Sequence, residues 1–472
     1  MKSIKYGIAV LAALATLSSC NENDFLKEEP KDFYSPENSM ETSAHFQSSL
    51  NYLYNRIRYQ QWELDPDTRF AFHYATDFAF NATDYYKAAK LNDYKNVMVP
   101  TFNVPANVWK QVYIVISNAN VILSRLPNAG SVPEEEAKVI RGEALFFRGF
   151  SYRMLANLFG GVPLILEEVP APRRDYVRAS REEVYEQIRK DLEEAVTLLP
   201  DIDAVKDGKI SKQVAQHLLS EIYICLNRND EAIQTATAVI NHPAMALMTN
   251  RFGSRANEEG DVYWDLFRLN NQNRSSGNKE SLWVLQYDYL NAGSKTAYNM
   301  PWAIIPYYQN IQITAKNEAG ADVKTTAFMG VTDAKGGRGV GWIQPTSYFF
   351  NTLWSKGSDQ DIRNSKFNII RDLQIDNPAS PAFGQWMVKD GYYKQVDSIR
   401  QWFPLITKFS RVGNFPEELY QVDATGNPLM TPFGEHLLIN SANSNYKDEY
   451  MFRLAETYLL RAEAYIRKGD LA

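Results

Sequence analysis

Apolar residues recur at helical spacing in six segments of this 472-residue chain, and they predict a mainly helical protein. The longest segment covers residues 133–159, where apolar positions return every three to five residues and give one broad buried face. A helix of this length needs a large partner surface to cover that face. The other five segments are 36–61, 105–126, 180–199, 211–242 and 453–470.

The ends of two of these helices carry recognisable signals. Ser131 followed by Glu134, and Ser180 followed by Glu183, each have the spacing of a capping box, so we expect both pairs to begin helices. The Gly160–Gly161 pair predicts a sharp end to the 133–159 helix, with an extended segment after it.

Small residues in two segments predict closely packed helix pairs. In 211–242, Ala232 and Ala236 follow Tyr223 at the offsets of a tetratricopeptide repeat, and Asn227 occupies the turn position that needs a left-handed backbone. Residues 453–470 repeat the first half of this pattern. Because such repeats stack on one another, we expect a tetratricopeptide-like shell that begins at residue 35.

Residues 244–445 have a different composition. This segment holds sixteen of the 24 glycines and seven of the nine tryptophans, at positions 264, 283, 302, 342, 354, 386 and 402. Its glycine-rich stretches and lack of long periodic runs predict an irregular, aromatic-rich insert between the shell at 35–243 and a last repeat helix at 446–472.

The amino-terminus has the pattern of an export signal. Lys2 and Lys5 precede a short apolar run that ends in the sequence LSSC at Cys20. We therefore expect residues 1–19 to be a signal peptide, Cys20 to be lipidated and residues 20–34 to form a tether to a membrane.

Composition excludes several classes of function. With a net charge of −6 and no basic block, nucleic acid is not an expected partner. The only cysteines are Cys20 and Cys225, so the chain is no disulfide scaffold, and we expect Cys225 to be a buried thiol. The five histidines lack zinc-site spacing, and no nucleophile elbow or phosphate loop occurs, so no metal, cofactor or catalytic residue is predicted. We expect Asp361 and Arg363 to form a structural ion pair.

Several motifs resemble the SusD/RagB family. The run RGEALFFR from Arg141 to Arg148, followed by LFGGVPL at 158–164, resembles its hallmark segment. WKQVY at 109–113 with NAN at 118–120, and DFLKEEP at 24–30, resemble two further family signatures. We expect the rings of Trp109 and Tyr113 to lie in the core.

The resemblance implies a surface-exposed lipoprotein of the outer membrane. Members of this family bind nutrients and act with a SusC-like TonB-dependent transporter, which makes such a transporter the expected partner. Family members usually continue beyond the last repeat signature with a C-terminal tail. We expect that this tail is missing from this sequence.

The expected ligand is a glycan, because aromatic side chains offer flat surfaces for the apolar faces of sugars. Our candidate ligand-binding residues are loop aromatics with one neighbouring carboxylate: Asp84, Tyr85, Tyr86, Trp302 and Trp342. Each ring could equally pack in the core. Two alternatives stay open: a peptide cargo, as in the RagB branch, and a surface glycoside hydrolase with a pair of carboxylates.

Overall fold

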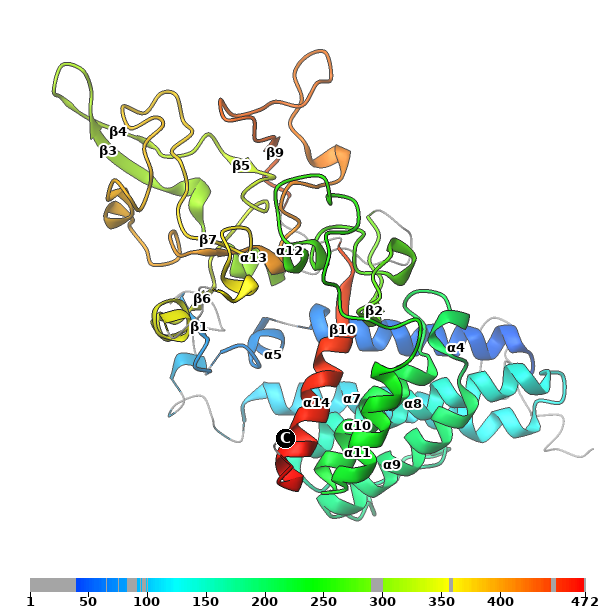
Figure 1. Cartoon of the computed structure of the whole chain (residues 1–472). Helices are drawn as coiled ribbons and strands as arrows, with labels where there is room; N and C mark the ends of the chain where they lie inside the picture. The colour runs from blue at the N-terminus through cyan, green and yellow to red at the C-terminus, as the bar shows by residue number, and fades with distance from the viewer. Residues whose placement is uncertain are drawn as a thin grey trace, which may run out of the picture.

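The computed structural model divides the protein into a helical shell and a loop-rich insert (Figure 1). It describes residues 40–64, 66–74, 76–82, 91–93, 95, 99, 101–289, 300–355, 360–442 and 447–470. The expected signal peptide, the lipidation site at Cys20, the tether and the candidates Asp84, Tyr85 and Tyr86 lie outside these residues.

Seven helices among the described residues build the shell, which occupies the lower half of Figure 1. They confirm the mainly helical fold that the apolar periodicity predicts. Their bounds are α4 Ser43–Arg58, α7 Asn103–Arg125, α8 Glu134–Phe159, α9 Arg181–Leu198, α10 Lys212–Cys225, α11 Asn229–Ile240 and α14 Leu454–Lys468.

One of the two predicted capping boxes forms. Before α9, the Glu183 N–H donates to the Ser180 hydroxyl at 3.1 Å, and the Ser180 N–H donates to the Glu183 carboxylate at 2.7 Å. The box predicted at Ser131 is wrong, because α8 begins after Pro133 and the Ser131 hydroxyl instead donates to the Glu41 carbonyl. Three glutamates in the first turn, from Glu134 on, favour this helix end through the helix dipole.

Helices α8 and α9 pack closely because glycines face α9. A Cβ on Gly142 would lie 2.9 Å from the Leu199 side chain, and one on Gly149 would lie 3.4 Å from that of Leu192. Between the helices, the buried Arg148 guanidinium binds the buried Asp191 carboxylate through two contacts of 2.7 Å. The hallmark run of the sequence therefore supplies both close contact and a buried ion pair.

The α10–α11 hairpin turns at Asn227, which has φ 58° as the pattern predicts. Helix α14 covers this hairpin. Thr457 of α14 contacts the His217 Nδ1 at 2.8 Å, and Lys468 binds Asp230 at 2.6 Å. The assignment of these helices to tetratricopeptide repeats stays a prediction. Cys225, at the end of α10, is a partly buried free thiol whose pKa is raised by burial.

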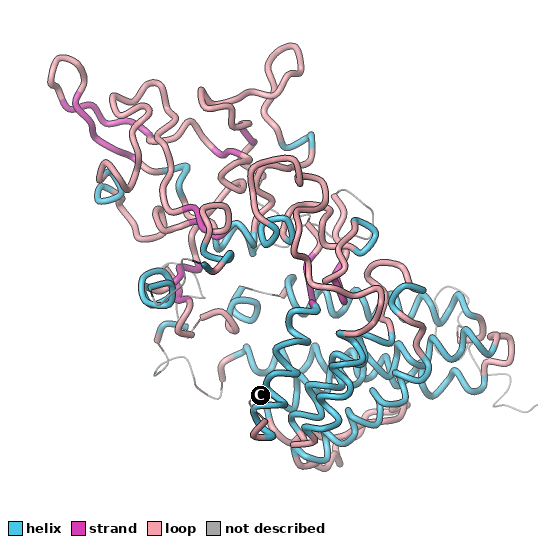
Figure 2. The backbone as a smooth tube through the Cα atoms, in the orientation of Figure 1, coloured by secondary structure: helices cyan, strands magenta, loops and turns pink. Residues whose placement is uncertain are grey.

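Loops dominate the part of the chain at the top of Figure 2. Short antiparallel strand pairs fix them: β1 Ala79–Asn81 with β6 Ile343–Pro345, β3 Gln312–Lys316 with β4 Asp322–Thr326, β5 Val331–Thr332 with β9 Leu437–Leu438, and β7 Ile369–Ile370 with β8 Leu405–Ile406. The short helices are α5 Pro66–Phe70, α12 Val262–Leu266 and α13 Met300–Ile304. The described strands form only two-stranded sheets, which agrees with the predicted irregular insert.

One strand pair joins the two parts. Strand β2, Ser281–Leu285, pairs with β10, Glu449–Arg453, and β10 runs directly into α14 (Figure 1). Trp283 of β2 is 1% exposed, and its ring lies 5.5 Å from Phe146 and 5.7 Å from Phe452. This tryptophan of the insert is therefore part of the shell core. In the described part of the chain, no helix has the length and apolar character to span a bilayer.

Candidate ligand-binding pocket

The insert contains an open pocket of about 550 Å³, which we call the insert pocket. Segments far apart in the sequence build it, from the residue before β1 to the turn after β8. Its lining residues are Phe78, Tyr263, Phe349, Leu353, Trp354, Asp361, Arg363, Asn368, Ile369, Ile406, Lys408 and Phe409.

Aromatic rings form one wall of the insert pocket. The Phe349 ring lies 6.1 Å from that of Phe78 and 5.8 Å from that of Trp354, edge-to-face in both cases. The backbone fixes this wall, because the Thr346 N–H donates to the Phe78 carbonyl at 2.8 Å and continues the β1–β6 pairing. The wall offers flat apolar surface at low entropic cost.

Polar groups lie beside these rings. Asp361 and Arg363 form the predicted ion pair, with the Arg363 Nε 2.9 Å from the Asp361 Oδ1, and these hydrogen bonds lower the pKa of Asp361. The Arg363 guanidinium also lies 5.9 Å from the centre of the Trp354 ring. Among the described residues, the buried Oδ1 of Asn368 has no hydrogen-bond donor. The pocket can therefore both stack on a ligand and hydrogen-bond to it.

Lys408 adds a positive charge to the insert pocket. It is half-buried in the turn Thr407–Phe409, and its Nζ lies 5.2 Å from the Phe267 ring and 5.5 Å from the Phe409 ring. Burial lowers the pKa of Lys408 from 10.5 to about 8.

The structure brings together two of the predicted site residues. The Trp302 and Trp342 rings lie 4.6 Å apart, but Trp342 is only 6% exposed and packs edge-to-face against Phe70. Trp302 is half-buried and has the Arg338 guanidinium 5.9 Å from its ring centre. Their part in ligand binding stays a prediction, and burial leaves Trp302 as the more accessible ring.

This tryptophan pair and the insert pocket lie at opposite ends of the β1–β6 strand pair. At one end the Ala82 N–H donates to the Trp342 carbonyl at 2.9 Å, and at the other Phe78 lines the pocket. Sequence reasoning missed Tyr263, Phe349, Trp354 and Lys408 as pocket residues. The aromatic run YFFNTLW at 348–354 is a signal that could have found Phe349 and Trp354, whereas Tyr263 and Lys408 lie outside it.

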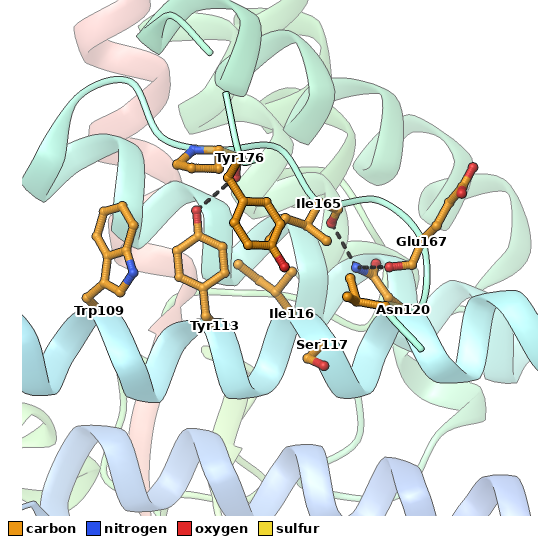
Figure 3. Close-up of a pocket in the computed structure, with 10 residues that line it drawn as sticks. Trp109, Tyr113, Ile116, Ser117, Asn120, Ile165, Glu167 and Tyr176 are labelled. Carbon is orange, nitrogen blue, oxygen red and sulfur yellow. Dashed lines mark hydrogen bonds between the residues drawn. The ribbon is translucent and has the colours of Figure 1, made fainter. Parts of the chain in front are cut away.

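A second pocket, of about 310 Å³, lies in the shell between α7 and the segment after α8 (Figure 3). We call it the shell pocket. Trp109, Tyr113 and Tyr176 form its aromatic walls. Trp109 and Tyr113 pack against the shell core, as their spacing predicts, but they are only half-buried and also form walls of this pocket.

Two polar side chains of the shell pocket donate hydrogen bonds to backbone carbonyls of the segment after α8. The Tyr113 hydroxyl donates to the Pro163 carbonyl at 2.8 Å, and the Asn120 amide donates to the carbonyls of Ile165 and Glu167 at 2.8 and 3.2 Å (Figure 3). The Tyr113 hydroxyl and the Asn120 amide therefore already donate to backbone carbonyls, whereas a bound sugar needs free hydrogen-bonding groups around its ring. The insert pocket, with its cation and buried amide oxygen, is therefore the better ligand-site candidate.

Comparison with protein families explains the signature motifs. One family model, described as "Starch-binding associating with outer membrane", matches residues 24–224, and another, described as "SusD family", matches residues 279–472. The chain belongs to the SusD/RagB family.

Curated SusD-like relatives come from Formosa agariphila. "SusD-like protein P2" is 28% identical over 303 residues, which are 63% of this chain and 55% of the relative. "SusD-like protein P38" is 24% identical over 319 residues, 65% of this chain and 58% of the relative. The chain thus matches little more than half the length of these SusD-like proteins.

Solved SusD-like structures share the fold. A "Laminarin binding SusD-like protein" superposes with a TM-score of 0.60 at 20% identity, over 90% of this chain and 80% of that one. "Surface glycan-binding protein A from Bacteroides thetaiotaomicron" gives a TM-score of 0.62 at 17% identity, over 92% and 80% of the two chains. At these identities the likeness extends to the fold alone.

Proposed function

We propose that this SusD/RagB protein captures an oligosaccharide in its insert pocket at the bacterial surface and delivers it to a SusC-like TonB-dependent transporter. The observation that carries the proposal is the aromatic wall of Phe349 and Trp354 beside the polar groups of Arg363 and Asn368. Such a site matches the alternating apolar faces and hydroxyl edges of a sugar ring.

Two fold neighbours support this proposal, since one is a laminarin-binding SusD-like protein and the other is a surface glycan-binding protein. The family description places related proteins at the outer membrane. A lipid on Cys20 would tether this protein there, and weak aromatic stacking would let it release its cargo to the transporter.

The pocket gives little support to the hydrolase alternative. Glycosidases use two carboxyl groups on either side of the scissile bond. Asp361 is the only carboxylate among the described residues that line the insert pocket, and it is bound by Arg363. A peptide cargo remains an outcome of the experiment.

Isothermal titration calorimetry tests the proposal. The chain from residue 21 onward, which carries every described residue, is titrated with plant, host and microbial glycans and with mixed peptides. We expect saturable glycan binding that Trp354→Ala weakens, with no sugar released on long incubation. Binding to peptides alone, or release of free sugar, would contradict the proposal.

A further inference from the structure

Four cationic side chains lie at or near the insert pocket, and two of them, Lys408 and Arg363, line it. The Phe267 ring has the Nζ of Lys408, the Nζ of Lys447 and the guanidinium of Arg453 at 5.2, 5.7 and 5.4 Å from its centre. Arg363 is the fourth cation, and its guanidinium lies 5.9 Å from the centre of the Trp354 ring. Buried or partly buried positive charges this close together are costly unless carboxylates pair with them.

Three of these cations have a carboxylate. Lys447 lies 3.6 Å from Glu449, the Arg453 guanidinium lies 2.9 Å from Glu280, and Arg363 is bound to Asp361.

Lys408 is the fourth, and among the described residues no carboxylate lies at ion-pair distance from its Nζ. It is also the lysine that lines the insert pocket. The pocket therefore holds one positive charge that has no ion-pair partner among the described residues.

The surroundings of Lys408 make this charge costly. Desolvation is the main cause of its lowered pKa, and the charges of Arg453 and Arg363 lower the pKa further, while Glu449 opposes them. The Lys447 ammonium donates to the Lys408 carbonyl at 2.7 Å and adds positive charge nearby. Because the empty pocket disfavours the charged form of Lys408, a ligand with a negative charge would gain binding free energy there.

Resting on the glycan function proposed above, we propose that the insert pocket binds a sugar unit carrying an anionic group, a uronate carboxylate or a sulfate ester, with the Lys408 ammonium as its counter-charge. The anion would complete the fourth ion pair, and the sugar ring would lie against the Trp354 wall. The buried Asn368 Oδ1 would accept a hydrogen bond from a sugar hydroxyl. A neutral sugar would bury Lys408 further without compensating its charge.

Paired ligands that differ in charge test this proposal. Tetramers of galacturonate, mannuronate and guluronate are titrated beside their methyl esters, and a κ-carrageenan tetrasaccharide beside its desulfated form. We expect at least one acidic ligand to bind about tenfold or more tightly than its uncharged match, the size of one charge-assisted contact. The carboxylate and sulfate arms distinguish the two sources of the anion.

Variants place the effect at Lys408. Lys408→Gln should remove the preference for the acidic ligand, and Lys408→Arg, which keeps the charge at all working pH values, should retain it. Lys316→Gln is the matched control, because this exposed lysine lies on the β3–β4 hairpin outside the insert pocket. Far-ultraviolet circular dichroism checks that each variant is folded.

A pH series adds an independent readout. Affinity for the acidic ligand should fall as the pH rises through about 8, where Lys408 loses its proton, and Lys408→Arg should show no such fall. Lys447 has a pKa lowered to about 8 by the same burial, so the comparison with Lys408→Arg is needed to assign the titration.

The outcomes separate this inference from the proposed function. Neutral glycans that bind as well as acidic ones, with binding lost in Trp354→Ala, would leave the glycan function in place and overturn the anionic class. A preference for acidic ligands that Lys408→Gln leaves unchanged would also overturn the role of Lys408. A folded protein that binds no glycan at all would overturn both.

Discussion

Trp354 is the ring on which the proposed stacking most depends. It stands at the end of the 348–354 run, held edge-to-face by Phe349, and it has the Arg363 guanidinium on one side. A ring fixed in this way loses little side-chain entropy when a sugar binds to it.

The first prediction concerns this ring. Trp354→Ala should raise the Kd for the bound glycan about five- to tenfold, because it removes one stacking contact of about 1 kcal/mol and its buried area. Trp386→Ala is the control: this tryptophan is 37% exposed in the insert but does not line the pocket. Calorimetry that finds equal losses in both variants would contradict the assignment of the wall.

The second prediction concerns the stability of the empty protein. The folded-state pKa of Lys408, about 8, lies below the ordinary 10.5, so the charged lysine disfavours folding below about pH 8. Lys408→Met should therefore raise the melting temperature at pH 7 by about 1–2 °C. The advantage should shrink between pH 8 and 10.5, where the wild-type lysine becomes neutral in the folded state.

Differential scanning calorimetry at pH 7 and pH 10 checks this prediction. A variant less stable than the wild type at pH 7 would mean that Lys408 is compensated in the empty protein.

At the scale of elements, the shell depends on how α8 ends and how it meets α9. Gly160 has φ 73° at the end of the helix, and Gly161 lies so close to the next segment that a Cβ would sit 2.1 Å from the Ala179 carbonyl oxygen. The two glycines of the family hallmark thus serve different needs: a left-handed backbone and a close backbone contact.

The third prediction follows from that contact. Gly161→Ala should destabilise the protein by about 2 kcal/mol or more, because the methyl group meets backbone that cannot rotate away. Gly130→Ala should have little effect, since nothing lies within 4 Å of its Cβ position. Urea denaturation of both variants measures the difference, and equal stabilities would contradict the packing described here.

The fourth prediction concerns the buried pair of α8 and α9. Arg148→Met leaves the Asp191 carboxylate buried without its main partner and should cost about 3–5 kcal/mol. Arg173→Met removes an exposed pair with Asp175 and should leave the stability almost unchanged. If Arg148→Met unfolds the protein, the double variant Arg148→Met, Asp191→Leu should recover part of the stability.

The shell could be predicted from sequence because its signals are local. The apolar periods located α7, α8 and α9 to within a few residues. The prediction of a capping box at Ser131 was wrong because Pro133, and not Ser131, precedes the first residue of α8. The spacing of Ser131 and Glu134 alone does not show whether Ser131 or Pro133 caps the helix.

The insert pocket could not be predicted in the same way. Phe78, Tyr263, Trp354 and Lys408 come from four separate segments of the chain, and only the folded chain brings them together. Local sequence also does not reveal burial. Trp342 follows a glycine-rich loop, which suggests an exposed ring, but the ring is buried and packs against Phe70.

At the scale of the whole molecule, the helical shell provides the packed core, and the loops of the insert carry the proposed ligand pocket. The helices form one compact part, and the β2–β10 pair connects it to the loops that carry the pocket (Figure 1). This division allows the loops to vary with the ligand while the shell keeps its packing.

The fifth prediction concerns attachment to the membrane. Cys20→Ala should move the protein from the membrane fraction to the soluble fraction of expressing cells, because acyl chains on Cys20 supply the expected anchor. Cys225→Ala, in the partly buried thiol of α10, is the control and should leave the distribution unchanged. Membrane retention of Cys20→Ala would contradict lipidation at this residue.

A crystal structure of the protein with the tightest glycan from the calorimetric screen tests the central claim most directly. We predict electron density for a sugar ring against Trp354 and Phe349 in the insert pocket. Density in the shell pocket, between Trp109 and Tyr176, or elsewhere on the surface with the insert pocket empty, would contradict the account.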